Sequence, residues 1–169
     1  DVIRLGVDIE KFADIEPMEA KKKLGFKEDD YIVLNLNRNS YRKQWCTTIK
    51  AWFRFWMDNN MDSRIKLFVG CVAKTDDGYD ILGLIKVECA KYNVEFEHVV
   101  MNHIYANPTP LMATDEYINV LNCACDVGVN TCCGEGFGLT NVEHAWHGKP
   151  QVVAGIPSVK EVLGDVAVV

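Results

Sequence analysis

Three cations stand close together in a turn between two apolar segments of the sequence. Arg38, Arg42 and Lys43 lie within six residues, just after the apolar run Tyr31–Leu36. That run has the composition of a buried strand, so the cations would follow the carboxyl end of a strand. Because Arg and Lys make charge-assisted hydrogen bonds to phosphate oxygens, this position suits an anionic ligand such as a diphosphate. A solvated basic turn is the alternative interpretation, which would be favoured for such a cluster at another position.

Glycines alternate with other residues just before a helix-like segment that begins at Leu139. Gly134, Gly136 and Gly138 form this turn. It is not the dinucleotide fingerprint, because Leu stands where the last Gly would be, nor a Walker A loop, because no Gly-Lys-Ser/Thr follows. The physical basis is shared, however: glycines let backbone N–H groups approach an anion, and a helix N-terminus adds partial positive charge. A tight turn that needs glycine for its backbone angles is the alternative.

Two carboxylates flank the same turn. Glu135 lies in it, and Glu143 follows eight residues later within the expected helix. Carboxylates aimed at phosphate would be repulsive, whereas they are good acceptors for sugar hydroxyls. The pair therefore suits the two ends of a sugar nucleotide. The alternative is that Glu143 only complements the positive end of its helix and that Glu135 is solvated.

Cysteines and histidines near this region raise the question of a metal site. The chain has seven cysteines, and an odd number favours free thiols in a reducing compartment. The residues available for a metal are Cys123, Cys125, Cys132, Cys133, His144 and His147. They contain no pair of Cys-x-x-Cys motifs, the usual spacing of structural zinc. We therefore expect no metal and no cofactor, and a zinc-stabilised interaction domain is the least favoured alternative.

The composition is that of one globular domain. The 169 residues are 49% hydrophobic and 25% charged, with a net charge of −6. This excludes disorder of the whole chain, and no run approaches the ~18 apolar residues of a transmembrane helix. The acidic balance argues against a nucleic-acid partner. The start at Asp1 and the strand-like end at Val166–Val169 lead us to expect a piece of a longer protein.

Strands and helices are expected to alternate. Strands are predicted at Tyr31–Leu36, Ile65–Val69, within Val94–Met101, and at Asp126–Asn130, Gln151–Ala154 and Val166–Val169. Helices are predicted at Glu19–Leu24, Lys43–Met57, Asp80–Tyr92, Thr114–Ala124, Leu139–Trp146 and Ser158–Leu163, with Thr114 as an N-cap. This alternation predicts an α/β fold with a doubly wound, Rossmann-like parallel sheet. Ligands of such sheets bind at the carboxyl ends of the strands, where the cations and glycines fall.

The run from Glu135 to Ala154 follows a pattern: Glu-Gly-Phe-Gly-Leu, three residues, Glu, a short helix, Gly-x-Pro and Val-Val-Ala. This closely resembles the signature of glycosyltransferase family 4, whose members are retaining enzymes of the GT-B fold. The resemblance covers essentially the whole chain, through Leu5–Asp8, the five-residue spacing of Arg38 and Lys43, Asn93–Phe96 and Cys125-Asp126. The chain departs from the family at Asn37, where Gly is usual, at the bulky His144 and Trp146, and in a slightly short loop at 154–161.

The resemblance implies that the chain is the C-terminal, nucleotide-sugar-binding half of a two-domain transferase. Residues 1–20 would be the interdomain connector and residues 21–169 the donor domain, with the N-terminal acceptor domain absent. Arg38 and Lys43 would bind the donor diphosphate as it leaves, and Glu135 would face the transferred sugar. Backbone N–H groups of Gly136, Phe137, Gly138, Leu139 and Thr140 would hold sugar and phosphate, Glu143 would accept from the ribose, and Val100 and Met101 would lie near the base.

The resemblance also implies a donor, an acceptor and a cellular location. Fixed cations would stabilise the diphosphate as it leaves without a metal, and the sequence has no Asp-x-Asp pair. GDP-mannose is the expected donor, from its frequency in the family, and a glycan or lipid-linked hydroxyl the expected acceptor. We expect a cytoplasmic protein that, at full length, is peripheral to a membrane. The alternative is a non-catalytic Rossmann-like module that binds a nucleotide or phosphate.

Overall fold

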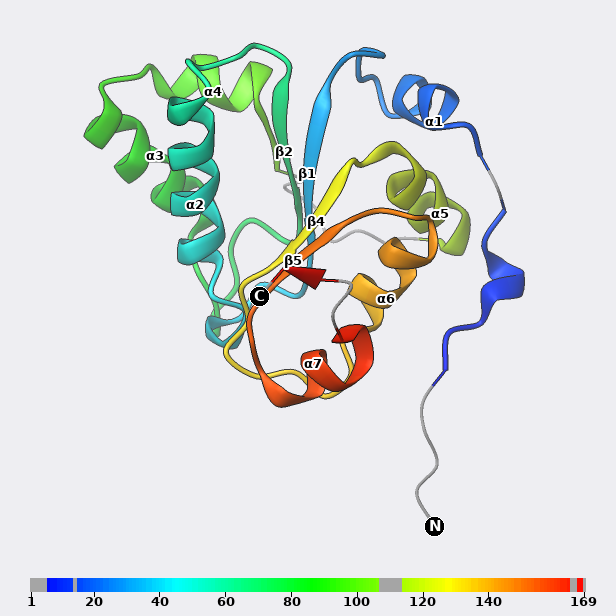
Figure 1. Ribbon diagram of the computed structural model, residues 1–169. Coiled ribbons are helices and arrows are strands. Elements are labelled where there is room, and N and C mark those ends of the chain that lie inside the picture. The colour runs from blue at the N-terminus through cyan, green and yellow to red at the C-terminus, as the bar shows by residue number, and fades with distance from the viewer. Residues whose placement is uncertain (1–5, 14, 107–113, 165–166, 169) are drawn as a thin grey trace.

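The computed structural model describes residues 6–13, 15–106, 114–164 and 167–168 and shows an α/β fold (Figure 1). Its strands are β1 (Tyr31–Leu36), β2 (Ile65–Gly70), β3 (Ile104–Ala106), β4 (Val127–Asn130), β5 (Gln151–Val153) and β6 (Ala167–Val168). Its α-helices are α1 (Pro17–Lys23), α2 (Trp45–Asp58), α3 (Ile81–Tyr92), α4 (Phe96–Asn102), α5 (Asp115–Ala124), α6 (Leu139–Trp146) and α7 (Pro157–Leu163). Two 3₁₀ turns, η1 (Ile9–Lys11) and η2 (Tyr41–Lys43), complete the order.

The strands form one parallel sheet in the order β3-β2-β1-β4-β5-β6. β1 lies in the middle, with β2 on one side and β4 on the other, so the chain first moves outward to β3 and then crosses back to β4. This change of direction makes the sheet doubly wound and confirms the predicted fold class. The carboxyl ends of β1 and β4 meet at the switch point, where a ligand site is expected.

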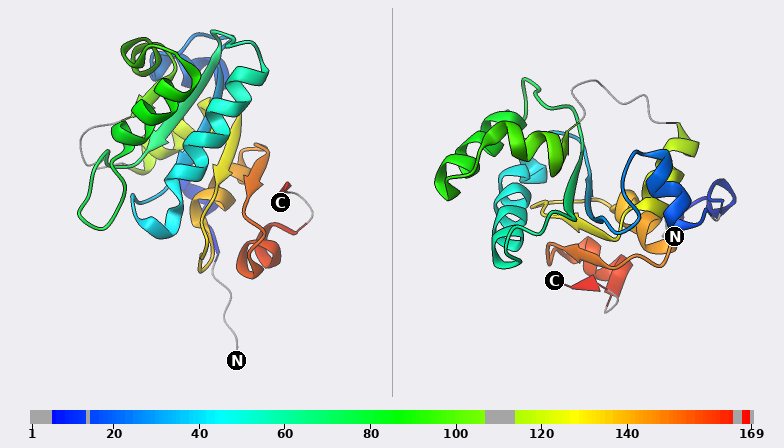
Figure 2. Two further views of the ribbon diagram at one scale, coloured as in Figure 1. Left: turned by 90° about the vertical axis from the view of Figure 1, so that its left-hand side faces the viewer. Right: turned by 90° about the horizontal axis from the view of Figure 1, so that it is seen from above.

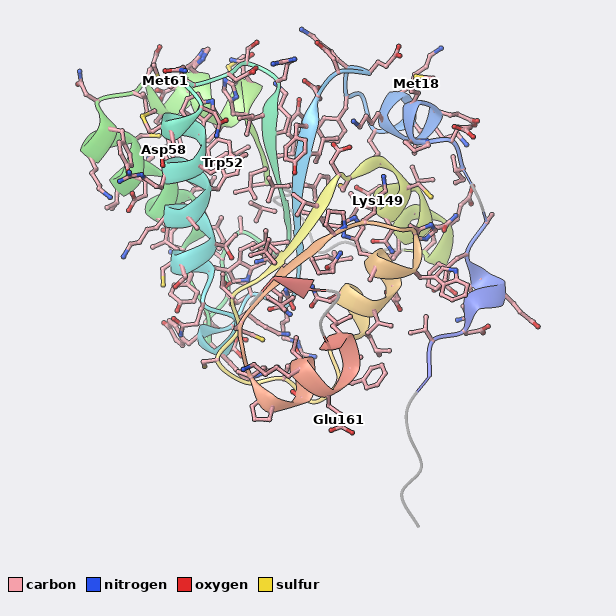
Figure 3. The ribbon with its side chains drawn as sticks, viewed as in Figure 1. Met18, Trp52, Asp58, Met61, Lys149 and Glu161 are labelled. Carbon is pink, nitrogen blue, oxygen red and sulfur yellow. The ribbon has the colours of Figure 1, made fainter. Side chains whose placement is uncertain are left out.

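Helices cover both faces of the sheet (Figure 2). The helix α2 buries one apolar stripe against the first face, formed by Trp45, Ile49, Trp52, Phe53 and Trp56. Figure 3 shows Trp52 on the side of α2 that faces the sheet. In β1, Val33 joins this cluster while Ile32 and Leu34 pack in a second cluster. Because successive strand residues point to opposite faces, a strand buried on both faces reads as a continuous apolar run.

Two helices begin at a side-chain cap. The Thr114 hydroxyl accepts the Tyr117 N–H at 3.2 Å, as predicted for the N-terminus of α5. Asp80 accepts the Gly83 N–H at 2.9 Å at the start of α3. Such caps satisfy a backbone donor that has no partner inside the helix, so they fix where each helix begins.

The third strand is not where the sequence predicted it. Val94–Met101 was expected to contain a strand, but α4 begins within it at Phe96, and β3 follows at Ile104–Ala106. In α4, Val99 is fully buried, and Phe96 and Val100 pack against the same cluster. Positions 96, 99 and 100 have helical spacing, so this apolar run serves a helix face rather than a strand.

Charged groups are buried at the amino-terminal edge of the sheet. Lys21 Nζ lies 3.1 Å from Asp126 Oδ2 and donates to the Asp30 carbonyl at 2.7 Å. Asp126 also accepts the Ile32 N–H at 2.8 Å, and Lys66 Nζ lies 3.6 Å from Asp30 Oδ1. These contacts join α1 to the starts of β1, β2 and β4, and so hold the edge opposite the expected site.

Some expectations fall beyond the described residues. Of the expected connector, residues 1–5 and 14 lie outside them, as do Val166 and Val169 of the last predicted strand. The described part of that strand is β6. Within the described ranges, no helix is both long and apolar enough to cross a membrane.

Candidate functional site

A cleft opens at the carboxyl edge of the sheet, beside the switch point. Its volume is about 390 Å³, and its walls come from the loops after β1 and β2 and from α5 and α6. Arg38, Thr140 and Glu143 all line it. The structure thus brings Arg38 together with two residues that the sequence singled out more than a hundred positions further along the chain. Arg38 is exposed, which leaves its guanidinium accessible to a ligand in the cleft.

The two remaining charged residues of the predicted site, Lys43 and Glu135, contact each other. Lys43 Nζ donates to Glu135 Oε2 in an ion pair between the loop after β1 and the loop after β4. Only 8% of the Lys43 side chain and 15% of the Glu135 side chain are exposed. Arg42 contributes a second cation, with Nη1 3.7 Å from Glu135 Oε1, and also donates to the Gly134 carbonyl. The basic turn and the glycine-rich turn therefore form one charged centre.

The charge of Glu135 is stabilised by its neighbours. Burial alone would raise the pKa of its carboxyl, but the hydrogen bond and charge of Lys43 act in the opposite direction. The Gly136 N–H, 3.1 Å from Oε1, and Arg42 add to this effect. The pKa of Glu135 is therefore below its usual value, and the carboxylate is ionised at neutral pH.

Glu143 lies in a different environment. Burial in the cleft raises the pKa of its carboxyl, and the charge of Asp115 adds to the rise while Lys11 opposes it. Its carboxylate has room to accept hydrogen bonds from a ligand because it lines the open cleft. The two glutamates that looked alike in the sequence thus differ. Glu135 is paired with cations, whereas Glu143 faces the cavity.

The glycine-rich turn leads into α6 as expected. Gly138 is its N-cap residue, with a φ of 80° that a side chain would disfavour. Gly136 and Leu139 are exposed, while Phe137 is half-buried. The Asn141 N–H bonds to the Gly138 carbonyl at 2.9 Å, so the helix starts directly at the turn. The N-terminus of α6 therefore opens beside Glu135 and the cleft.

A chain of buried polar side chains holds the two turns together, and sequence reasoning missed it. Asn35 at the end of β1 donates to the Thr48 hydroxyl at 2.7 Å, and Thr48 lies 2.8 Å from the Thr131 hydroxyl. The Thr131 hydroxyl also lies 3.2 Å from the Lys43 carbonyl. Asn37 joins through the Asn35 side chain at 2.6 Å. Polar residues inside apolar strands, such as Asn35, were the only available signal.

Two further contacts fix the walls of the site. The buried Asn39 amide donates to the carbonyls of Val72 and Tyr79 at 2.9 and 2.8 Å, which joins the loops after β1 and β2. On the other side, the Ser158 hydroxyl donates to the Glu135 carbonyl at 2.6 Å. Ser158 lies in the first turn of α7, so α7 supports the loop that carries Glu135.

Val100 and Met101 do not lie where their expected role requires. That role depended on their following the third strand, but both belong to α4, which precedes β3. Val100 packs against the core, and Met101 is 76% exposed. Both therefore precede the amino-terminal end of β3, which lies at the edge of the sheet opposite the cleft. The segment that follows β3, residues 107–113, lies outside the described residues.

The cysteine and histidine residues considered for a metal do not gather into one cluster among the described residues. His144 is buried 3.3 Å from the Cys125 carbonyl, and Cys123 Sγ lies 3.4 Å from His147 Nδ1. Burial raises the pKa of the Cys125 thiol and of Cys132. Over the ranges that the structure describes, no three His, Cys, Asp or Glu side chains are grouped so that they could hold a metal ion.

Comparison with known proteins gives matches in structure only. No protein-family model and no curated protein sequence matches the chain. Among solved structures, HepE from Anabaena in complex with UDP-glucose matches with a TM-score of 0.66 and 21% identity, over 92% of this chain and 38% of that one. Sucrose-phosphate synthase from Thermosynechococcus elongatus matches with a TM-score of 0.67 and 19% identity, over 96% and 37% of the two chains.

A third neighbour is the UDP-forming α,α-trehalose-phosphate synthase from Burkholderia xenovorans. It matches with a TM-score of 0.64 and 18% identity, over 94% of this chain and 37% of that one. The chain therefore has the fold of a domain of GT-B glycosyltransferases. It spans less than two fifths of the length of these neighbours.

Proposed function

We propose that this chain is the donor-binding domain of a retaining, metal-independent glycosyltransferase that uses a nucleoside-diphosphate sugar. The observation that carries the proposal is the meeting of two sequence motifs at the switch point of the sheet. Arg38 and Glu143 line one cleft, and Lys43 and Glu135 pair on the loops beside it. The fold shared with GT-B glycosyltransferases supports the same conclusion.

The mechanism follows from where charge develops. As the bond from the sugar to the diphosphate breaks, negative charge grows on the diphosphate and positive charge on the sugar. Arg38, Lys43 and the N-terminus of α6 would stabilise the leaving diphosphate more strongly than the intact donor. Glu135 would face the sugar, and Glu143 would accept hydrogen bonds from the ribose. Acceptor residues would come from a part of the protein beyond this chain, with a glycan or lipid-linked hydroxyl as acceptor.

The donor is the part of the proposal that binding measurements can resolve directly. The resemblance to family 4 favours GDP-mannose, whereas HepE was solved with UDP-glucose. Thermal unfolding with each nucleotide sugar in turn would identify the ligand, because a ligand at ~100 times its dissociation constant adds about 2.7 kcal/mol of stability. We expect one donor to raise the unfolding temperature clearly above the others.

The site assignment is tested by removing its cations. Arg38→Ala with Lys43→Ala should weaken binding of that donor by at least about 100-fold, since each charged hydrogen bond contributes about 1.5–3 kcal/mol. Lys50→Ala with Arg54→Ala, two exposed cations of α2, is the matched control and should leave the affinity unchanged. Unchanged affinity in the Arg38 and Lys43 variant would refute the site.

Glu135 distinguishes a transferase from a module that only binds nucleotides. In a protein that also contains the acceptor part, Glu135→Ala should abolish sugar transfer and retain nucleotide binding. Full function in this variant would favour the binding module.

A further inference from the structure

The Glu135 carboxylate is placed among the cations that would bind a diphosphate. Oε2 accepts from Lys43, and Oε1 lies 3.7 Å from Arg42 Nη1. The Lys43 and Glu135 side chains are largely shielded from water. Charges in such surroundings interact more strongly than exposed charges, because water screens them less. A charge brought next to Lys43 would therefore also be close enough to respond to Glu135.

Glu135 is held at this position through both its backbone and its carboxylate. The Ser158 hydroxyl donates to the Glu135 carbonyl at 2.6 Å, and the Gly136 N–H bonds to Oε1 at 3.1 Å. The preceding residues are tied to Arg42, whose carbonyl accepts the Cys133 N–H at 3.0 Å. A ligand would therefore meet the carboxylate where it is, instead of displacing it into solvent.

An ionised carboxylate discriminates between two kinds of neighbour. It can only accept hydrogen bonds, so it is complementary to sugar hydroxyls and repels phosphate oxygens. A donor carries a sugar on its second phosphate, which leaves that phosphate one negative charge. The nucleoside diphosphate left after transfer ends in a free phosphate, whose second proton dissociates near a pKa of about 6. At neutral pH this product has lost the hydroxyls and gained a charge.

We infer that Glu135 is a specificity-determining residue that makes the site prefer the sugar-bearing donor over the nucleoside diphosphate. Lys43 binds either ligand, and Glu135 weakens binding of the nucleoside diphosphate, which has the extra charge and no sugar. This inference rests on the proposed function. The residue that would face the sugar thus also disfavours binding of the nucleoside diphosphate after transfer, and so favours its exchange for a new donor.

The experiment compares two dissociation constants in each of several variants. Calorimetric titration at pH 7.5 gives the affinities for UDP and UDP-glucose, and for GDP and GDP-mannose. In Glu135→Gln, which keeps the side-chain shape and removes the charge, the ratio of the product constant to the donor constant should fall about tenfold. Glu135→Ala, which opens Lys43 to water, should shift the ratio in the same direction, and far-ultraviolet circular dichroism checks that both variants are folded.

Two further variants separate this effect from a general change in charge or binding. Glu143→Gln should weaken binding of donor and of product by the same factor, because both carry the ribose. Glu97→Gln, an exposed carboxylate on α4, should leave both constants unchanged. If the ratio in both Glu135 variants equals the wild-type ratio, the inference is wrong while nucleotide binding stands. If the wild type binds none of these four ligands and no other nucleotide sugar raises its unfolding temperature, the proposed function itself fails.

Discussion

His144 is a residue that the fold keeps neutral. It is 1% exposed, with Nε2 3.3 Å from the Cys125 carbonyl and Nδ1 2.9 Å from Gln151 Nε2. The carbonyl requires a proton on Nε2 and the amide leaves Nδ1 as acceptor, so the neutral ring satisfies both contacts. Burial lowers the pKa of His144 to about 4, although the bond to Cys125 favours the charged form. The sequence marked His144 as bulkier than is usual in the family, and its partners explain how this residue is accommodated.

Stability should therefore decrease in acid because of His144. Its folded pKa is below the unfolded value, so between about pH 6.5 and 4 the unfolded chain binds more protons and stability falls as pH falls. A pKa of about 4 corresponds to a loss of about 3 kcal/mol over this window. His144→Gln should flatten this part of the profile in urea unfolding at several pH values, and exposed His98→Gln should not. A variant profile as steep as the wild-type profile would contradict the assignment. Some pH dependence should remain in the variant, because burial also lowers the pKa of His103.

At the residue scale, local motifs predicted the identities in the site but not their contacts. Arg38, Lys43, Glu135 and Glu143 stand in recognisable spacing, and the structure brings them to one edge of the sheet. The pairing of Lys43 with Glu135 joins residues 92 positions apart, so no local pattern could encode it. The same holds for the bonds between Asn35, Thr48 and Thr131, which join β1, α2 and the loop after β4.

At the scale of elements, prediction succeeded where a segment was long enough to show its period. The fourteen-residue helix α2 and the six-residue strands β1 and β2 were recognised from their apolar patterns. β3 has three residues, too few to show alternation, and the short helix before it contains valines that resemble a strand. The misplacement of Val100 and Met101 follows directly from that ambiguity.

The packing of α6 on the sheet depends on a small residue in β4. Gln151 in β5 connects Asn141 and His144 of α6, through bonds of 3.0 and 2.9 Å. A Cβ added to Gly128 would collide with the Gln151 side chain. Gly128→Ala should therefore displace Gln151 and cost about 1–3 kcal/mol of unfolding free energy.

Urea unfolding measures this cost, and Gly6→Ala is its control, since a Cβ there meets nothing within 4 Å. If Gly128→Ala is as stable as Gly6→Ala, Gln151 can move without loss, and the proposed connection between β4, β5 and α6 is wrong.

At the scale of the whole molecule, the two edges of the sheet use lysine differently. At the amino-terminal edge, Lys21 is buried against Asp126 and backbone carbonyls, which is a contact between α1 and the starts of strands. At the carboxyl edge, Lys43 pairs with Glu135 on two loops beside a cleft. In the first arrangement the lysine ammonium bonds to acceptors of the protein itself, whereas the second lies where a ligand can approach. Stability and binding should therefore depend on different lysines.

Replacing each lysine by methionine, which keeps its apolar stem, tests this separation. Lys21→Met leaves the Asp126 carboxylate without its cation, and because Asp126 is partly exposed we expect a loss of about 2 kcal/mol, or roughly 4–8 °C in unfolding temperature. The stabilisation by added nucleotide sugar should be unchanged in this variant. Lys43→Met should strongly reduce that stabilisation, and exposed Lys22→Met should change neither quantity. If Lys21→Met reduced the ligand-induced shift as strongly as Lys43→Met, the two edges would be coupled and the division between them would be wrong.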